Sequence, residues 1–390
     1  MGIIGAGVGG LSAGMMLKSI GCEVSILEKR KKTAALGVGI QISANGIRAL
    51  RPFGLEDKIS NLADCPFCIE FINGKSGKKL GMMPLGQEAE NLYGARFFQL
   101  HRGDLISILR NENLRRGVTI SCETRVLDIC QDPNGVTVCT NKGHKYFDLV
   151  VAADGVNSLV RNQIFGSTSA TFLKQVAYRT VVPAELLPVA FTSKKTRLFL
   201  GKGKHVVSYP IRKGSLVNLV FCLDFDSYCQ ENWDQHSSFM EIREKFSDFR
   251  TLEKVFETTE PVKKWGLFEH KSPKIWHKKR IVLLGDACHP ILPYLAQGAT
   301  QAIEDSFELS NRIKQSLKSQ DLEKELKKYT RNRLPRVEKI RKASRLNEKL
   351  FHLKNPISIL FFHMLLGLIS RTYPKFLLKR FSWIYSGGPA

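Results

Sequence analysis

Three glycines near the start of the chain have the spacing of a loop that holds a phosphate. Gly5, Gly7 and Gly10 follow a short apolar run and precede a helical pattern. In such a turn the first glycine allows the tight bend, the second lets a pyrophosphate approach the backbone, and the third lets helix and strand pack closely. Glu28 ends a second predicted strand, 23–27, where an acidic residue accepts hydrogen bonds from a ribose. The pattern predicts dinucleotide binding; the alternative is a glycine-rich turn without a ligand.

Two later segments have the pattern of buried strands that end in polar residues. The first, 147–153, is followed by Asp154 and Gly155, and Arg161 lies a few residues further on. The second, 280–284, is followed by Asp286. After a proline-containing loop, residues 297–305 have the pattern of a helix start, with Gly298 and Ala299 at its first positions.

Taken together, these motifs resemble those of the class A flavoprotein aromatic hydroxylases, single-component FAD monooxygenases of the salicylate and 3-hydroxybenzoate hydroxylase type. The resemblance also covers 37–45, 101–105 and 292–299. It implies that FAD is the cofactor, with Gly5, Gly7 and Gly10 on the pyrophosphate and Glu28 on the adenosine ribose.

The resemblance assigns further residues to the cofactor. Arg102 is expected along the phosphate and ribityl region, Asp286 on ribityl hydroxyls, and Gly298 and Ala299 at the pyrimidine edge of the flavin, where a helix N-terminus stabilises negative charge. Pro293 is expected near the reactive flavin edge. The family links the motif of Asp154, Gly155 and Arg161 to both FAD and pyridine nucleotide; the alternative is a turn that only supports the FAD site.

The reaction that the resemblance implies is hydroxylation of a small aromatic substrate. NADH or NADPH reduces the flavin, O2 gives a flavin C4a-hydroperoxide, and a hydroxyl passes to the ring. A salicylate-like or hydroxybenzoate-like acid is expected first. A heteroaromatic ring, a lipophilic phenol or a non-catalytic flavin-binding protein are the alternatives, and the sequence does not separate NADH from NADPH.

Candidates for a base lie in the middle of the chain. The segments 206–210 and 216–221 read as adjacent strands of a hairpin. His205 comes directly before 206–210, at the start of the first strand, where related salicylate-type enzymes often carry a histidine near the substrate, and histidine titrates near neutrality. The alternative is a structural histidine at a strand edge. Tyr209 is a second candidate, either catalyst or pocket wall.

The amino-acid composition limits the classes of molecule that the protein is expected to bind. The 390 residues hold 59 Lys and Arg against 36 Asp and Glu, so the net charge is +23. This charge suits nucleic acid, an anionic membrane or phosphorylated ligands, but no nucleic-acid-binding motif supports the first. Much of it lies in 314–345, which reads as two amphipathic helices with a solvated basic face. No metal site is expected, and the nine cysteines fit free thiols in a cytoplasmic protein.

The C-terminal region combines an apolar run, 357–369, with basic and aromatic residues after it. The run is too short to span a bilayer. Two interpretations stay open: the segment 383–385 packs on the enzyme or its partner, which is favoured, or the helix makes peripheral contact with a membrane surface.

The expected fold is α/β: an FAD-binding, Rossmann-like three-layer domain with a mixed β-sheet substrate domain and a helical C-terminal segment. The predicted boundaries are 1–165 for the first part of the FAD domain, with substrate-domain insertions around 65–100, 166–272 for the mixed sheet, 273–345 for completion of the FAD domain, and 346–390 for the tail. Both a monomer and a homodimer fit the sequence.

Overall fold

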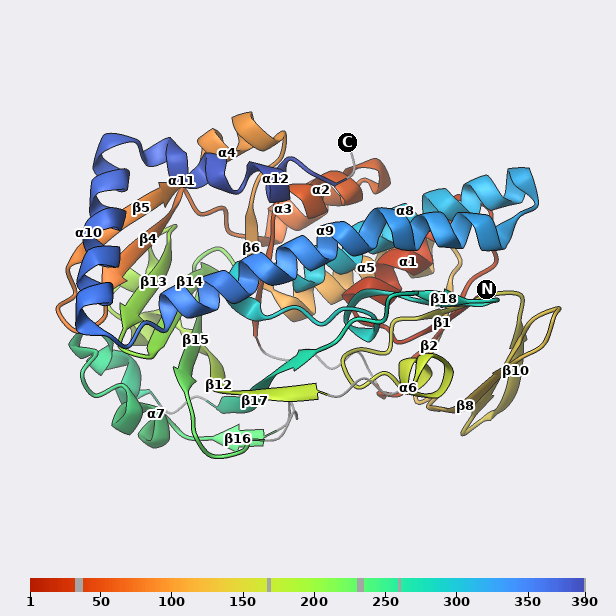
Figure 1. The fold of residues 1–390 in the computed structure, drawn as a ribbon, viewed down its shortest axis with the longest axis horizontal. Coiled ribbons are helices and arrows are strands. Elements are labelled where there is room, and N and C mark those ends of the chain that lie inside the picture. Colours follow the sequence, from red (N-terminus) through yellow and green to blue (C-terminus); the bar gives the residue numbers. More distant parts are fainter. Residues whose placement is uncertain (32–37, 167–169, 230–234, 259–260, 389–390) are drawn as a thin grey trace.

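The computed structural model describes residues 1–31, 38–166, 170–229, 235–258 and 261–388, so Gly37 of the segment 37–45 lies outside the described residues. A parallel sheet with its helices occupies one end of the molecule, and a larger mixed sheet occupies the other (Figure 1). The α/β fold with a mixed sheet and C-terminal helices confirms the expected fold class.

The sheet at the first of these ends has six strands. Five of them run parallel, and the sixth, at one edge, is antiparallel to its neighbour. The residues of its three central strands, Gly2–Ile4, Val150–Ala152 and Ile281–Leu283, are all buried, as expected for a parallel sheet covered on both faces. In spatial order the strands are β18 (His277–Lys278), β19 (Ile281–Leu283), β11 (Val150–Ala152), β1 (Gly2–Ile4), β2 (Ser25–Leu27) and β7 (Thr119–Ser121).

Helices and a small antiparallel sheet complete the three layers. Three helices share the core of this region: α1 (Val8–Ser19), α5 (Arg102–Arg115) and α8 (Gly298–Ser319). On the other side lie α6 (Leu159–Phe165) and the antiparallel strands β8 (Val126–Gln131), β9 (Val136–Thr140) and β10 (Gly143–Phe147) (Figure 1). α1 ends before Gly21, whose φ of +92° suits the predicted helix stop.

The mixed sheet has eight strands, antiparallel except where β13 pairs with β4. In order they are β16 (Gln235–Ser237), β17 (Val262–His270), β12 (Ala170–Pro183), β15 (Leu216–Asp224), β14 (Lys204–Ile211), β13 (Thr196–Gly201), β4 (Cys68–Asn73) and β5 (Lys79–Pro84). One face packs on α7 (Phe239–Lys245) and a 3-10 helix, η4 (Arg250–Glu257). The predicted hairpin is present as β14 and β15, and β4 and β5 come from the predicted insertion.

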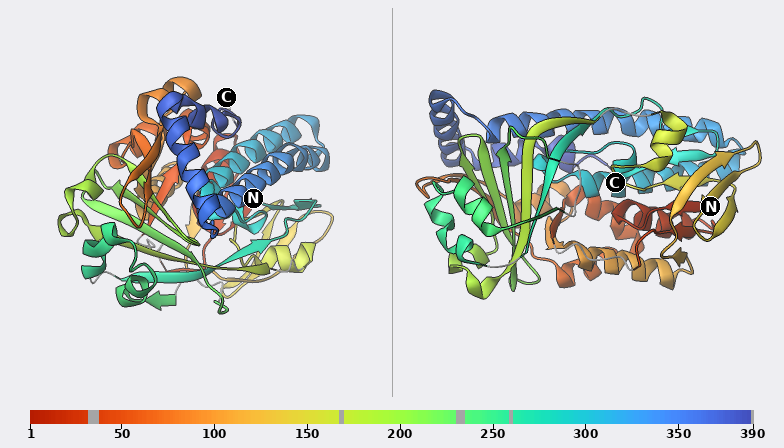
Figure 2. Two further views of the ribbon diagram at one scale, coloured as in Figure 1. Left: turned by 60° about the vertical axis from the view of Figure 1, so that its left-hand side comes forward. Right: turned by 90° about the horizontal axis from the view of Figure 1, so that it is seen from below.

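The remaining elements connect these parts. β3 (Gly39–Ile42) and β6 (Phe98–His101) pair as a two-stranded antiparallel sheet. Between them in the chain lie the helices α2 (Ala44–Leu50), α3 (Leu55–Leu62) and α4 (Gly86–Tyr93). α9 (Leu322–Phe351) then runs along the length of the molecule, and α10 (Pro356–Thr372), α11 (Pro374–Arg380) and α12 (Ser382–Tyr385) follow it (Figures 1 and 2). The predicted boundary at 345/346 falls inside α9; the domain boundaries stay predictions.

Two further observations concern helices that could cross a membrane and the state of the cysteines. Across the described ranges, no single helix is long and apolar enough to cross a bilayer; only α9 and α10 taken together meet that criterion, and they are bent by 113°. All nine cysteines are free thiols in the structure.

Candidate active site

The glycine loop between β1 and α1 has the backbone that its sequence predicts. Gly5 has a φ of +102°, and a Cβ there would collide with the carbonyl oxygen of Ala153. A Cβ on Gly10 would collide with the carbonyl oxygen of Gly5. A Cβ on Gly7 would meet nothing within 4 Å, so the backbone is open on that side. The first and third glycines are therefore required by packing, whereas the second leaves room for a ligand.

Glu28, at the end of β2, is bound to this loop. Its Oε2 accepts a hydrogen bond of 2.7 Å from the backbone N–H of Ala6, and its Oε1 accepts one of 2.9 Å from the N–H of Arg30. The carboxylate thus fixes the loop against the second strand. Its contact with a ribose stays a prediction.

Two distant parts of the sequence, Arg102 and the segment 286–298, bring polar groups together beside the parallel sheet. Asp286 lies in a short 3-10 helix, η5 (Gly285–Ala287), and its Oδ1 is 4.0 Å from where a Cβ on Gly298 would be. Burial lowers the pKa of Arg102, the first residue of α5, and the charge of Asp286 opposes that shift. Within the described ranges, neither side chain makes a hydrogen bond, so a ligand has both an acceptor and a donor available.

The motif of Asp154, Gly155 and Arg161 serves mainly to position its neighbours. The guanidinium of Arg161 donates hydrogen bonds of 2.6 Å to the carbonyl of Val156 and 3.2 Å to the carbonyl of Ala287. Gly155 has a φ of +85°, and Asp154 accepts from the N–H of Val160 at 3.3 Å. Arg161 therefore ties this turn to the segment of Asp286, which favours the alternative of a turn that supports the cofactor site.

α8 begins at Gly298, followed by Ala299, in agreement with the predicted helix start. The first N–H groups of a helix have no intrahelical partner and form its positive end. The preceding Gln297 is fixed through its side chain, which donates to Ser43 at 2.9 Å and accepts from Gln301 at 3.0 Å. This end of α8 is thus a rigid group of donors.

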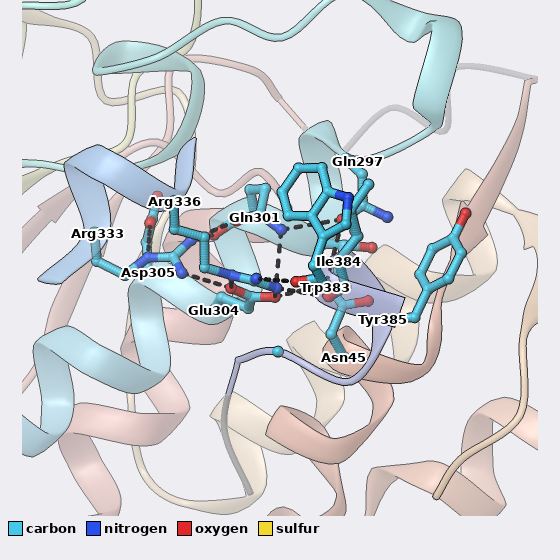
Figure 3. A network of polar contacts seen from close by, with 12 residues as sticks. Asn45, Gln297, Gln301, Glu304, Asp305, Arg333, Arg336, Trp383, Ile384 and Tyr385 are labelled. Atoms are coloured by element: carbon cyan, nitrogen blue, oxygen red, sulfur yellow. Dashed lines mark hydrogen bonds and ion pairs between the residues drawn. The ribbon is translucent and has the colours of Figure 1, made fainter. Parts of the chain in front are cut away.

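A buried ionic network supports that helix and connects it to α9 (Figure 3). Arg333 pairs with Asp305 at 2.7 Å and with Glu304 at 2.5 Å, and Arg336 pairs with Glu304 at 2.7 Å. Asn45 of α2 donates to Glu304 at 2.6 Å. Although burial opposes ionisation, His289 and Arg333 hold the pKa of Asp305 at about 2.

This network corrects one sequence interpretation. Arg333 lies in the segment 314–345, which was expected to present a solvated basic face, yet its side chain is buried between α8 and α9. The sequence carried one signal for it. Arg333 and Arg336 are three residues apart, so both lie on one face of a helix. Glu304 and Asp305 are adjacent at the end of the predicted helix start, 297–305, and offer two negative charges to such a pair of cations.

His205 and Tyr209 lie on one face of the mixed sheet. The register pairs His205 with Cys222 and Tyr209 with Asn218, so these side chains share a face. Arg179 of β12 is on that face by the same register, with its guanidinium 4.6 Å from the centre of the Trp265 ring. The face points towards β3 and the start of α5, because Asn218 accepts a 2.6 Å hydrogen bond from the N–H of Gly39, and the neighbouring Val38 accepts one from the N–H of Arg102.

His205 is part of a chain of hydrogen-bonded groups that sequence reasoning missed. Its Nδ1 is 2.9 Å from Nε2 of His352 at the end of α9, and Nδ1 of His352 is 2.7 Å from Oδ1 of Asp224. Burial lowers the pKa of His205 well below its ordinary value, and His352 lowers it further. β14 lies between β15 and β13, so His205 is not at a sheet edge.

The loop of Pro293 joins the two groups of residues. It runs from Asp286 to Gly298 and contains a 3-10 helix, η6 (Pro293–Leu295). The ring of Tyr294 lies 5.5 Å from the ring of His205. The residue next to Pro293 therefore contacts the candidate base, while both ends of the loop lie at the candidate cofactor groups.

These residues fit FAD. The open backbone at Gly7 suits a pyrophosphate, the unpaired Asp286 and Arg102 suit hydroxyl and phosphate groups, and the start of α8 suits an anionic ring edge. Among the described residues, no group of His, Cys, Asp and Glu is arranged to hold a metal ion.

The glycine loop gives a first prediction. Gly7→Ala should fold normally, because its Cβ meets no atom, but should bind FAD at least about tenfold more weakly, the effect of losing one charge-assisted hydrogen bond. Gly10→Ala should lower the stability of the apoprotein itself. Thermal melting of both apoproteins and FAD titration by flavin fluorescence check this; equal FAD affinity for Gly7→Ala and the parent protein would contradict it.

Comparisons with known proteins agree with this geometry. The family model described as "FAD binding domain" matches residues 1–344. The 3-amino-4-hydroxybenzoate 2-monooxygenase of Streptomyces cremeus is 31% identical, over 90% of this chain and 87% of its own. The 3-hydroxybenzoate 6-hydroxylase 1 of Aquipseudomonas alcaligenes is 28% identical, over 98% of this chain and 96% of its own.

Solved structures share the fold. A salicylate hydroxylase substrate complex has a TM-score of 0.80 and 21% identity, covering 100% of this chain and 95% of that one. HpxO of Klebsiella pneumoniae, complexed with FAD and uric acid, has a TM-score of 0.87 and 22% identity, covering 100% of this chain and 97% of that one. The chain therefore belongs to the FAD binding domain family and is an FAD-dependent flavoprotein monooxygenase.

Proposed function

We propose that this monooxygenase hydroxylates a small, hydroxyl-bearing aromatic or heteroaromatic acid, with NADH or NADPH as the reductant. The overall reaction consumes the ring C–H, one O2, one NAD(P)H and one proton, and it yields the ring C–OH, water and NAD(P)⁺. The relatives support the substrate class, since their names include 3-amino-4-hydroxybenzoate, 3-hydroxybenzoate and 6-hydroxynicotinate. A salicylate-like or hydroxybenzoate-like acid is the first choice.

The observation that carries this proposal is the chain from Asp224 through His352 to His205. Asp224 accepts a hydrogen bond, so Nδ1 of His352 carries the proton and its Nε2 is an acceptor. His205 must then donate from Nδ1, which leaves the lone pair on its Nε2. Because burial keeps His205 neutral, this atom can accept the proton of a phenol and increase the electron density of the ring.

The same chain offers the proton a way out. When Nε2 of His205 gains a proton, Nδ1 can release its own to His352, and His352 can release one to the partly exposed Asp224. His205 is then neutral again without opening the site to water, with its proton on Nε2 and its lone pair on Nδ1. The reverse relay, with return of the Nε2 proton to the phenolate oxygen of the product, restores the starting tautomer. Gln175 helps to fix the position of Asp224, because its amide donates a hydrogen bond of 3.2 Å to that carboxylate and accepts one of 2.7 Å from the hydroxyl of Tyr294.

The other residues of the sheet face suit the rest of the substrate. The guanidinium of Arg179 places a positive charge on the face of Tyr209 and His205, which favours a carboxylate. Tyr209 is proposed as a pocket wall with a polar tip, since burial raises the pKa of its phenol and disfavours its ionisation. Bound FAD supplies the electron transfer and the activation of oxygen.

The direct test measures NADH and NADPH oxidation by the FAD-loaded protein with a panel of ring acids, while the product is identified by mass spectrometry. The panel contains salicylate, 3-hydroxybenzoate, 3-amino-4-hydroxybenzoate and 6-hydroxynicotinate, each matched with its neutral amide. An acid should stimulate oxidation and appear as its hydroxylated product, whereas its amide should not. Preference for amides or lipophilic phenols would contradict the acid assignment, and retained FAD without any hydroxylated product would contradict the proposed reaction.

A further inference from the structure

The helix α10 presents a continuous apolar face to solvent. Ile357, Leu360, Phe361, Met364 and Leu368 are between 60% and 78% exposed. Their positions follow the helical repeat, so all five lie along one side of a helix that is about 26 Å long at 1.5 Å per residue. Isolated exposed apolar residues are common, but a stripe of this length on one helix marks an interaction surface.

The fold fixes this face outward, because the opposite side of α10 is occupied. Leu366 is buried, and the hydroxyl of Ser370 accepts a 2.8 Å hydrogen bond from the N–H of Met82 in β5. A Cβ on Gly367 would lie 3.2 Å from the carbonyl oxygen of Leu80. α10 forms one end of the molecule, beyond β4 and β5 (Figure 1). Rotation of the helix to hide its apolar face would break these contacts.

The end of the chain is held in place as well. The guanidinium of Arg48 donates to the carbonyls of Tyr385, Ser386 and Gly387, and Arg336 donates to those of Trp383 and Ile384. The segment 383–385 thus packs on the enzyme, as predicted. It covers α2 and α9, not the outer face of α10, so that face stays free of the described part of the chain.

The charges around this face have one sign. From residue 349 to residue 390 the sequence has six Lys and Arg and no Asp or Glu. Arg371, Lys379 and Arg380, at the C-terminal end of α10 and in α11, are exposed and form no ion pair within the described residues. An apolar stripe bordered by unpaired cations has the chemistry of a helix that lies in the headgroup region of an anionic bilayer.

We propose that the outer face of α10 docks on an anionic phospholipid bilayer, with its five apolar side chains below the headgroups and the cations of α11 on the phosphates. A second copy of this chain fits the face less well. Two such faces would bring like charges together on two molecules that each carry +23. An anionic surface attracts the same charges, so the complementarity selects the bilayer.

The test measures co-sedimentation of the FAD-loaded protein with vesicles of phosphatidylcholine, with and without phosphatidylglycerol. The double variant Leu360→Ser with Phe361→Ser should lower the partition coefficient on the anionic vesicles at least about tenfold. Burial of each of the two apolar side chains contributes more than half of the binding free energy that a tenfold change requires, so that losing both exceeds it. The matched control is Leu127→Ser with Leu317→Ser, two residues 49% and 60% exposed in β8 and at the end of α8, at the other end of the molecule. FAD absorbance and the melting temperature show that each variant is folded.

Each outcome decides the proposal. Binding that requires phosphatidylglycerol, weakens with salt and falls only in the α10 variant supports it. Equal binding of the α10 variant would show adsorption through net charge alone and overturn it. Absence of vesicle binding would also overturn it. A dimer in sedimentation velocity that the α10 variant abolishes would overturn it and assign the face to a second copy. None of these readouts requires turnover, so failure of the proposed reaction stays distinguishable.

Discussion

Replacing His205 with glutamine is expected to lower kcat for hydroxylation by about 10²–10⁴-fold, the usual contribution of a general base. Glutamine keeps a polar group of similar size in the sheet but has no lone pair that can take up a proton near neutral pH. FAD binding should change little, because His205 lies on the mixed sheet and the glycine loop lies on the parallel sheet. Single-turnover product formation by the FAD-loaded variant, with the preferred acid of the panel, measures the effect.

His352 acts through His205, so its replacement tests a positioning role. His352→Phe keeps an aromatic ring at the end of α9 but removes the acceptor of the 2.9 Å hydrogen bond from His205. We expect a smaller loss of kcat than for His205→Gln, and no further loss in the double variant, because the two residues work as one unit. Additive losses in the double variant would show that His352 does not act through His205.

The pH profile gives an independent readout. The base works only when neutral, so kcat falls as the pH drops through the pKa of His205. Burial and then His352 lower that pKa, so the parent enzyme should keep its activity below the ordinary range of histidine. His352→Phe removes the second cause and should shift the acid limb to higher pH. Among the described residues, the charged groups around this chain are Asp224, which also pairs with Lys354 at 2.7 Å, and Glu348, with the phenol of Tyr294 beside them. His144→Gln, an exposed histidine in β10, is the control.

The parts of the site that the sequence predicted are those with local causes. Gly5 and Gly10 are required by the turn between β1 and α1, so their spacing alone indicates the loop. The positions of Asp286 and Gly298 follow in the same way, because a strand end and a helix start are properties of short segments. His205 came from the resemblance, and the structure adds its partners rather than its position.

The missed residues depend on packing between distant segments. His352 and His205 are 147 residues apart, and they meet only because α9 runs back along the molecule to the mixed sheet. The segment around Arg333 is rich in Lys and Arg, and this composition alone predicts a solvated face. Its burial is decided by Glu304 and Asp305 on α8, and helical periodicity contains no information about which helix packs opposite.

The largest expected effect on stability follows from that packing. Arg333→Met should lower the free energy of unfolding by about 3–5 kcal/mol, the typical cost of removing one partner from a buried ion pair. Methionine fills a similar volume, so the loss reflects charge rather than a cavity. Among the charged partners that the structure describes, Asp305 would keep only its 2.5 Å contact with Nε2 of His289, and Glu304 only its ion pair with Arg336. Urea unfolding of the FAD-loaded protein, followed by circular dichroism, measures the change.

The pH dependence of this loss separates charge from packing. In the parent protein the pKa of Asp305 is held at about 2, so its stabilising contribution is present above the unfolded pKa, about 3.9, and is lost only as the pH falls towards 2. Without Arg333 we expect the pKa values of the buried Glu304 and Asp305 to rise, so that protonation removes the cost of burying their unpaired charge. The difference between Arg333→Met and the parent should therefore be largest near pH 7 and shrink as the pH falls towards 4. Arg331→Met, an exposed position on the same helix, should change stability by less than about 0.5 kcal/mol. A loss in Arg333→Met that stays constant with pH would mean that shape, and not the ion pairs, holds α8 against α9.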